Sequence, residues 1–271
     1  GGHPAHIPQM TWDDLKNYHD DYYHPSNSLS LLYGKIEDVP AFLTLLDGYF
    51  SKYEKKEFAF EDADYTPITA PVQQQYDFAV EAGSDTANGA VVYYGYALTD
   101  ATQADEDALD LLTTLLNEAS SPFQQAMKKQ LPSANARCYY DNASPEISVV
   151  FQATGMKAED APLFQQVVEE SLAGIREHGF DLTAVEAVAA ATRISLLLST
   201  ESASVGTDVA PSIAYMWAAT GRTDAYSRYV DNTANYVPYA EQGIYQQVIA
   251  KHLSDNPRTA LVVTAPVPGL K

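Results

Sequence analysis

The six histidines of this chain are the residues whose chemistry first suggests a metal or acid–base site: His3, His6, His19, His24, His178 and His252. In one known arrangement, a His-x-x-Glu-His motif on a helix supplies two imidazole ligands to zinc, and its glutamate is the general base for the bound water. None of the histidines lies in such a motif. His19 and His24 come closest, but they are separated by five positions and by a helix end at Pro25, whereas ligands on one helical face need spacings of three or four. We therefore expect turn and packing roles for this pair, and we predict no catalytic and no metal-binding residue in the chain.

Tyrosine is the one residue type present in unusual number, with 19 copies. Several of them fall in two segments that read as strands: Tyr93, Tyr94, Tyr96, Tyr139 and Tyr140. Because side chains alternate across a strand, Tyr94 and Tyr96 share a face and Tyr93 lies opposite. Tyrosines on one face could line a groove that holds an extended peptide by stacking and hydrogen bonding. Tyr94 and Tyr96 are therefore candidate substrate-binding residues, with ordinary packing against helices as the alternative.

Other motifs that carry chemistry are missing from the sequence. It contains no Gly-x-Ser-x-Gly elbow, no Walker-type loop and no Gly-x-Gly-x-x-Gly, so acyl-hydrolase, nucleotide-hydrolase and dinucleotide-binding functions lose their usual anchors. Adjacent acidic pairs at 13–14 and 20–21 read as solvated helix faces rather than calcium ligands or glycosidase carboxylates. The single cysteine, Cys138, excludes an internal disulfide and reads as a small strand residue rather than a nucleophile.

The formal net charge of -20 limits which classes of partner the chain can bind. Phosphate binding requires clustered Lys and Arg, so the charge argues against nucleic acid and anionic membranes. The simpler explanation of the acidity is that it keeps the chain soluble. The more specific one is that an acidic surface attracts basic peptides toward a chamber. The longest apolar stretch, 184–198, is interrupted by Glu186 and Arg193, so we expect no membrane span.

The N-terminal segment predicts a helix, a short strand and a second helix. Thr11 can cap the first helix, which would turn Leu15, Tyr18 and Tyr22 inward, and Pro25 stops it. Residues 29–33 read as a buried strand, and residues 39–53 read as a helix with one apolar face. Three elements in so few residues cannot close a core by themselves. This segment is therefore typical of the end of a domain.

The remainder predicts a second, larger domain. Residues 57–72 mix charge with Pro67 and Pro71 and lack a helical stripe, as a linker would. Strands are expected at 76–80, 91–97, 137–140, 147–153 and 259–264, and helices at 105–119, 122–131, 164–178, from Asp181 onward, 202–220 and 239–252. This order of strands, helix, strands, several helices and a final strand predicts an α+β fold with helices on one face of a sheet.

Four parts of the sequence resemble the pitrilysin/insulinase family of zinc metallopeptidases. The first is the string from Tyr18 and His19 through Tyr22, Tyr23, His24, Pro25, Ser26 and Asn27 to Tyr33 and Gly34, which is similar to the end of that family's catalytic domain. The lead-in of Gly1, Gly2, His3, Pro4, Ile7 and Pro8 resembles the presequence-protease (falcilysin-like) branch, with His3 where that branch often has Asp. Ser121, Pro122 and Phe123, and the segment 202–217 with Ser204, Gly206, Ile213, Ala214 and Trp217, resemble parts of the family's second domain.

The resemblance implies a fold, a division into domains and a function. The fold would be the pitrilysin/mitochondrial-processing-peptidase-like domain, with a largely antiparallel sheet and helices on one face. Residues 1–56 would be the C-terminal portion of the first, catalytic-type domain, 57–72 the linker, and 73–271 the second, noncatalytic domain. The chain would be a noncatalytic segment of a zinc-dependent metalloendopeptidase that degrades short unfolded peptides in an enclosed chamber, and it would supply chamber wall and an exosite.

Several further expectations accompany this interpretation. The zinc would belong to the parent enzyme, and this segment alone should be inactive. Its partners would be the remaining domains of the same polypeptide and the peptide substrate, with no nucleic acid and no membrane. A cytoplasmic location is favoured by the single cysteine and the acidity. The alternative is a catalytically inactive family member that acts as a peptide-binding or scaffold subunit.

Overall fold

The computed structural model describes residues 6–58, 66–142 and 146–269. The lead-in at residues 1–4, residues 59–65 of the expected linker and part of the expected turn at 141–145 lie outside the described residues. The chain forms two compact units, one made of Gly1–Ala63 and Ala203–Thr223 and the other of Asp64–Ser202 and Asp224–Lys271. The division into domains at 1–56, 57–72 and 73–271 stays a prediction.

The smaller unit consists of helices joined by irregular segments. They are η1 (Ile7–Gln9), α1 (Trp12–Tyr22), η2 (Pro25–Asn27), α2 (Val39–Phe50) and α7 (Val205–Thr220). Thr11 begins α1 with a capping box, in which its hydroxyl accepts from the Asp14 amide at 3.2 Å and Asp14 Oδ2 accepts from the Thr11 amide at 2.8 Å. His24 is extended, at φ -142° and ψ 145°, because Pro25 follows it. The predicted cap and the predicted helix end are both confirmed.

The strand predicted at 29–33 is wrong. These residues are irregular, and Leu31, Leu32 and Tyr33 are exposed. A strand is stabilised by hydrogen bonds to a neighbouring strand, and no strand of the described chain pairs with this segment. The apolar run alone was therefore not sufficient to predict the secondary structure.

Two of the segments that carry the resemblance meet inside the smaller unit. A Cβ atom built on Gly206 would lie 1.9 Å from Cγ of Tyr33, so the ring of Tyr33 occupies the space that any larger residue of α7 would need. Gly206 is buried. The glycine thus allows α7 to approach the irregular segment that contains Tyr33.

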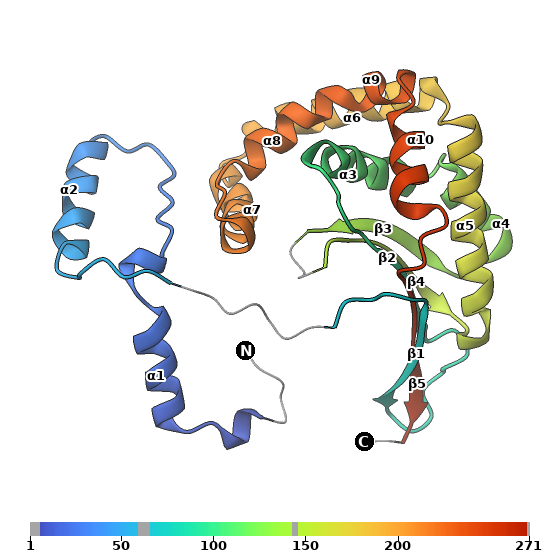
Figure 1. Ribbon diagram of the computed structural model, residues 1–271, viewed down its shortest axis with the longest axis horizontal. Helices are drawn as coiled ribbons and strands as arrows, with labels where there is room; N and C mark the ends of the chain where they lie inside the picture. The colour runs from blue at the N-terminus through green and yellow to red at the C-terminus, as the bar shows by residue number, and fades with distance from the viewer. Residues whose placement is uncertain (1–5, 59–65, 143–145, 270–271) are drawn as a thin grey trace. The chain divides into compact units, whose positions relative to one another are not determined.

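A five-stranded sheet forms the centre of the larger unit, in the order β1-β5-β2-β4-β3. The strands are β1 (Val72–Val80), β2 (Ala90–Ala97), β3 (Asn135–Asp141), β4 (Ser148–Met156) and β5 (Thr259–Pro268). β1 pairs with β5 in parallel, and the other three pairings are antiparallel. Figure 1 shows the C-terminal strand β5 inserted beside β1, although nearly the whole unit separates them in sequence. The predicted α+β fold with a largely antiparallel sheet is confirmed.

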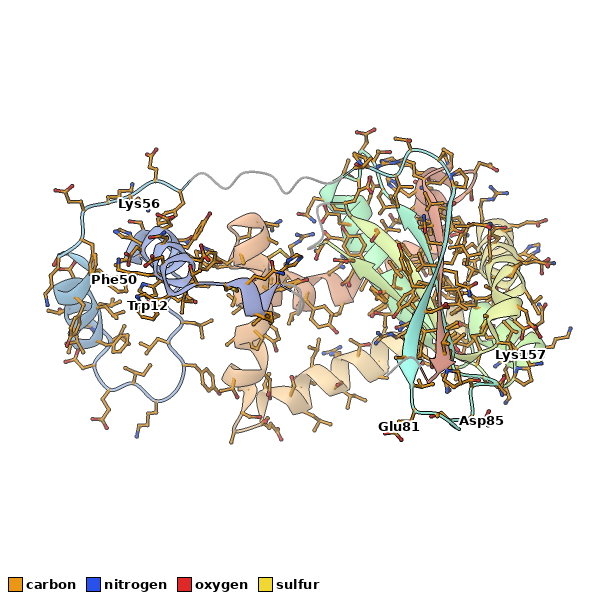
Figure 2. All side chains as sticks on the ribbon, turned by 90° about the horizontal axis from the view of Figure 1, so that it is seen from below. Trp12, Phe50, Lys56, Glu81, Asp85 and Lys157 are labelled. Carbon is orange, nitrogen blue, oxygen red and sulfur yellow. The ribbon has the colours of Figure 1, made fainter. Side chains whose placement is uncertain are left out.

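Helices cover one face of this sheet, and the core lies between them (Figure 1). The helices of the larger unit are α3 (Gln103–Asn117), α4 (Pro122–Gln130), η3 (Ala158–Asp160), α5 (Ala161–His178), α6 (Leu182–Thr200), α8 (Ala225–Asn232), η4 (Thr233–Asn235), α9 (Tyr236–Glu241), α10 (Ile244–Val248) and a π-helical turn (Ile249–Leu253). Leu109, Leu112 and Leu116 of α3 are fully buried, as their spacing on one helical face predicts. In Figure 2 the side chains crowd between the sheet and α5, while Glu81 and Asp85 lie in the exposed turn after β1.

The last predicted helix, 239–252, is interrupted. Gly243 adopts the left-handed conformation, with φ 69°, and separates α9 from α10, and the π-helical turn then replaces the end of the helix. A left-handed residue cannot continue an α-helix and is found most readily at glycine. The helix α8, at 225–232, was not predicted.

One helix in the described part of the chain, α6, passes the length and composition criteria for a membrane span, with a mean hydropathy of 1.5. Only Val185 and Val188 of this helix are buried. Core helices of soluble proteins pass the same test, so a single helix of this kind is weak evidence. The expectation that the chain has no membrane partner stays a prediction.

Candidate functional site

The face of the sheet that the helices leave uncovered carries a row of polar and aromatic side chains. Alternate residues of β2, β3, β4 and β5 point to this face and are partly exposed, which is the pattern of a half-buried sheet. The strand register places Val262, Tyr93, Gln152 and Arg137 side by side on four adjacent strands. We call these four residues the Tyr93 row.

Hydrogen bonds connect the polar members of the Tyr93 row. The Gln152 amide Nε2 donates to the Tyr93 hydroxyl at 3.0 Å, and Arg137 Nε donates to Gln152 Oε1 at 2.6 Å. Gln152 therefore fixes both the phenol and the guanidinium across the sheet. The result is a surface that offers a hydroxyl, an amide and a cation at defined positions.

Tyr139 extends this surface next to Arg137. The guanidinium carbon of Arg137 lies 5.4 Å from the centre of the Tyr139 ring, within the range of a cation–π contact. Burial raises the pKa of the Tyr139 hydroxyl, with Arg137 acting in the opposite direction, so the hydroxyl is a neutral donor at physiological pH. The open face therefore has hydrogen-bonding and aromatic groups and no nucleophile–base pair among its described residues.

The β3 edge of the sheet is closed by side chains from the helices. The Asn117 side chain receives a hydrogen bond from the Cys138 amide at 2.7 Å and donates one to the Cys138 carbonyl at 2.6 Å. Gln124 Nε2 donates to the Ala136 carbonyl at 3.0 Å. These side chains occupy main-chain groups that an added strand would need.

The predicted candidates Tyr94 and Tyr96 point to the other, helix-covered face. Only 2% and 3% of their surfaces are exposed, and their ring centres lie 5.0 Å apart. The Tyr94 hydroxyl donates to Glu169 Oε1 of α5 at 2.7 Å. Their shared face is as predicted, whereas their contact with substrate stays a prediction. Tyr93, on the opposite face, is the tyrosine of this strand that belongs to the open surface.

His19 and His24 take part in local contacts of the smaller unit. The His19 ring stacks on Tyr23 with ring centres 4.7 Å apart, and His24 Nδ1 accepts from the Ser26 amide at 3.1 Å. Within residues 6–58, 66–142 and 146–269, no three His, Cys, Asp or Glu side chains form a group that could hold a metal ion.

A partly buried ionisable cluster that sequence reasoning missed joins α3 to the π-helical turn. Asp105 Oδ2 lies 2.7 Å from Lys251 Nζ and 3.5 Å from Nε2 of the buried His252. Although partial burial acts to raise it, hydrogen bonds from Lys251 and Thr102 hold the pKa of Asp105 well below its usual range. Burial lowers the pKa of His252, which keeps the imidazole neutral near pH 7. We interpret the cluster as a structural link between the two helical elements.

The fold is that of peptidase domains of known structure. A protease from Helicobacter pylori superposes with a TM-score of 0.69 and 19% identity, over 98% of this chain and 62% of that one. A peptidase M16 inactive domain from Pseudomonas fluorescens gives a TM-score of 0.67 and 14% identity, over 100% of this chain and 61% of that one. At such identities the likeness defines the class of fold alone.

Sequence comparison defines the family. Residues 9–192 match the family described as the peptidase M16 inactive domain, and the chain belongs to it. Protein HypA of Clostridium perfringens is 21% identical over 277 residues, which cover 100% of this chain and 28% of that protein. The mitochondrial presequence protease of Danio rerio is 26% identical over 222 residues, or 80% of this chain and 22% of that protein. The chain thus spans about a quarter of the length of these relatives, and its predicted family is confirmed.

Proposed function

We propose that this chain is a noncatalytic segment of a zinc-dependent metalloendopeptidase that degrades short unfolded peptides in an enclosed chamber. Its open sheet face would form part of the chamber wall and an exosite for the substrate. The observation that carries the proposal is the Tyr93 row, which lies on the uncovered face of a chain that belongs to the inactive-domain family.

The chemistry of the Tyr93 row suits an extended peptide. Arg137 and the Tyr93 hydroxyl can donate to peptide carbonyls or acidic side chains, and Tyr139 offers an aromatic face. Because these groups project from paired strands, they are held more rigidly than groups on loops. These groups would bind the peptide but include no catalytic residue. Hydrolysis would therefore depend on zinc held by other domains of the same polypeptide. Those domains and the peptide are the proposed partners, with neither nucleic acid nor membrane.

Substitutions on the open face test the exosite in the intact polypeptide that contains this chain. We expect Tyr93→Ala combined with Arg137→Gln to raise KM for peptide hydrolysis about tenfold, through the loss of charge-assisted and neutral hydrogen bonds, and to leave kcat unchanged. Gln73→Ala is the matched control, because Gln73 is exposed on β1 and pairs with the buried Leu261 rather than with Val262 of the Tyr93 row, and it should leave KM as it is. An unchanged KM in the double variant would sink the exosite.

The isolated chain tests the noncatalytic assignment. We expect it to contain no stoichiometric zinc by elemental analysis and to cleave no peptide. Stoichiometric zinc that is lost on His19→Ala combined with His24→Ala would show that the assignment is wrong. The same measurements on the intact polypeptide should give both zinc and activity.

The second candidate is a catalytically inactive subunit that binds or scaffolds peptides. The matching family is itself described as inactive, which favours this alternative for the chain taken alone. An intact polypeptide without a His-x-x-Glu-His motif that binds peptides and does not cleave them would support it. A cytoplasmic location is also proposed, from the single cysteine and the acidity, and cell fractionation tests it.

A further inference from the structure

A pocket of about 300 Å³ lies on the helix-covered side of the sheet, within the larger unit and away from the Tyr93 row. It is bounded by β2, by α5 and by the loop between the π-helical turn and β5. Its volume is at the lower end of the range for small-molecule sites. Its lining combines three charged side chains with a hydroxyl and aliphatic groups: Glu169, Arg176, Asp255, Tyr94, Leu172 and Leu253.

One end of the pocket presents a carboxylate in a fixed position. Glu169 Oε1 accepts hydrogen bonds from the Tyr94 hydroxyl at 2.7 Å and from Gln165 Nε2 at 2.9 Å. Burial and the contact with Glu169 raise the pKa of Tyr94 to about 12, so its hydroxyl stays protonated and continues to donate. Both bonds go to Oε1. The other oxygen, Oε2, has no hydrogen-bond partner among the described residues and remains available to a ligand.

The other end presents a cation on the same helix. Arg176 follows Glu169 by seven positions, or two helical turns, so both side chains lie on one face of α5. The rise of an α-helix places the two Cα atoms about 10.5 Å apart. Arg176 makes no ion pair within the described part of the chain, although it lines the pocket. Its guanidinium can therefore receive a carboxylate in a bidentate arrangement.

The loop that closes the pocket is fixed by hydrogen bonds. Asn256 Nδ2 donates to the Ala97 carbonyl at 3.0 Å and to the His252 carbonyl at 2.8 Å. Asp255, beside it, has a left-handed backbone with φ 53° and adds a second carboxylate to the lining. The pocket thus has two anionic groups and one cationic group, and the aliphatic side chains of Leu172 and Leu253 complete its lining.

We propose that this pocket binds a short peptide through both of its charged ends. The N-terminal ammonium would lie against Glu169, and the C-terminal carboxylate would lie against Arg176. An extended chain spans about 3.3–3.6 Å per residue, so two or three residues match the separation of these groups. A free amino acid carries both charges on one carbon and cannot reach both ends. The site thus selects di- and tripeptides with free termini, independently of any exosite on the open face.

Calorimetric titration of the full 271-residue chain with trialanine tests this proposal. We expect saturable binding that weakens about tenfold when the N-terminus is acetylated and about tenfold when the C-terminus is amidated, as for loss of one charge-assisted hydrogen bond. Free alanine should bind at least about tenfold more weakly than trialanine. Absence of saturable binding at about 10 mM trialanine would overturn the proposal, and so would equal binding of the blocked peptides or of alanine.

Two variants assign the ends of the ligand. Arg176→Gln should bind trialanine no more tightly than it binds C-terminally amidated trialanine. Glu169→Gln, which retains an acceptor for Tyr94, should bind trialanine no more tightly than it binds N-acetylated trialanine. Both side chains are exposed, so the fold should be unaffected, and circular dichroism confirms this. Glu170→Gln is the matched control, because Glu170 is the next residue of α5 and contacts Gln166 outside the pocket. Wild-type affinity in both test variants would show that the pocket is not the peptide site.

Discussion

The side chain of Arg258 connects segments that lead into three strands of the sheet. It forms an ion pair with Glu146, and its Nε donates to the Ile68 carbonyl at 2.5 Å, while the Ile68 amide donates to Glu146 Oε2 at 3.3 Å. The starts of β1, β4 and β5 are therefore held by one pair of charges. Both side chains are less than one-fifth exposed, at 16% for Arg258 and 18% for Glu146. Removing one charge leaves the other poorly solvated.

We predict that Arg258→Met lowers the free energy of unfolding by about 2–4 kcal/mol, because Glu146 is left uncompensated in a largely buried position. Urea denaturation measures the change. Arg258→Met combined with Glu146→Gln should be less destabilised than Arg258→Met alone, since it leaves no unpaired charge. If the double variant loses as much free energy of unfolding as the two single variants lose together, the two side chains act independently.

The burial of His252 leads us to expect that the stability of the larger unit depends on pH. Its Nε2 makes no hydrogen bond among the described residues, and burial lowers its pKa against the opposing influence of Asp105 and Asp100, while Lys251 lowers it further. Below the ordinary histidine pKa of 6.5, the unfolded chain binds more protons at this residue than the folded chain. The free energy of unfolding therefore falls as the pH decreases through this range.

We predict that the stability advantage of the wild type over His252→Gln shrinks on acidification from pH about 7.5 to about 5.5, because glutamine does not titrate. Urea denaturation across this range measures the difference. Asp105 does not interfere with this measurement. Because its pKa is lowered from 3.8 in the folded chain, its effect on the pH dependence of the free energy of unfolding lies at more acidic pH than this range. A difference that is constant or grows on acidification would contradict the neutral, buried state of His252.

At the scale of elements, Asn117 connects α3 to the edge strand β3 through both the amide and the carbonyl of Cys138. We predict that Asn117→Ala destabilises the chain by about 1–2 kcal/mol, because both main-chain groups lose their partners. The free edge should also promote association through strand pairing, which light scattering measures. Gln130→Ala, at the exposed end of α4, is the control. An Asn117→Ala variant that stays as stable and as monomeric as this control would show that water replaces the side chain at no cost.

The contact between α7 and the segment that contains Tyr33 depends on the absence of a side chain at Gly206. We predict that Gly206→Ala costs about 1–3 kcal/mol, because its Cβ would overlap the Tyr33 ring. Tyr33→Ala in the same chain should relieve part of this cost, which a double-mutant cycle by thermal unfolding detects. Gly48→Ala, in α2 of the same unit, meets no atom within 4 Å and should be neutral or stabilising. Equal effects of the two alanine substitutions would contradict the close approach.

Local signals predicted the elements that end on specific residues, and they failed where the outcome depends on distant partners. Thr11 begins a helix through its side-chain hydroxyl and Pro25 ends one through its effect on the preceding backbone, and the structure agrees with the sequence at both. The apolar run at 29–33 lacks a partner strand, and the interruption at Gly243 requires a backbone conformation that the helical pattern conceals.

In the candidate site, too, the sequence predicted what depends on neighbouring residues and missed what depends on distant strands. The period of two correctly placed Tyr94 and Tyr96 on one face of β2, but a strand with tyrosines on both sides does not indicate which face the helices cover. The Tyr93 row also requires the register of four strands, which the sequence does not specify locally. Arg137, adjacent to the buried Cys138, carried the one available signal, since an arginine that alternates with a core residue must face outward.

For the whole molecule, the net charge of -20 predicts how peptides approach it. Charge of one sign raises the local concentration of opposite charges, and salt shortens the range of this attraction from about 30 Å at 0.01 M to about 3 Å at 1 M. We therefore predict that a labelled cationic peptide binds at least about tenfold more tightly at low salt than at 0.5 M, whereas an anionic peptide of equal length shows the reverse dependence. Fluorescence anisotropy measures both. If the acidity serves solubility alone, the two peptides will respond equally to salt, and steering of basic substrates would be excluded as a role for this charge.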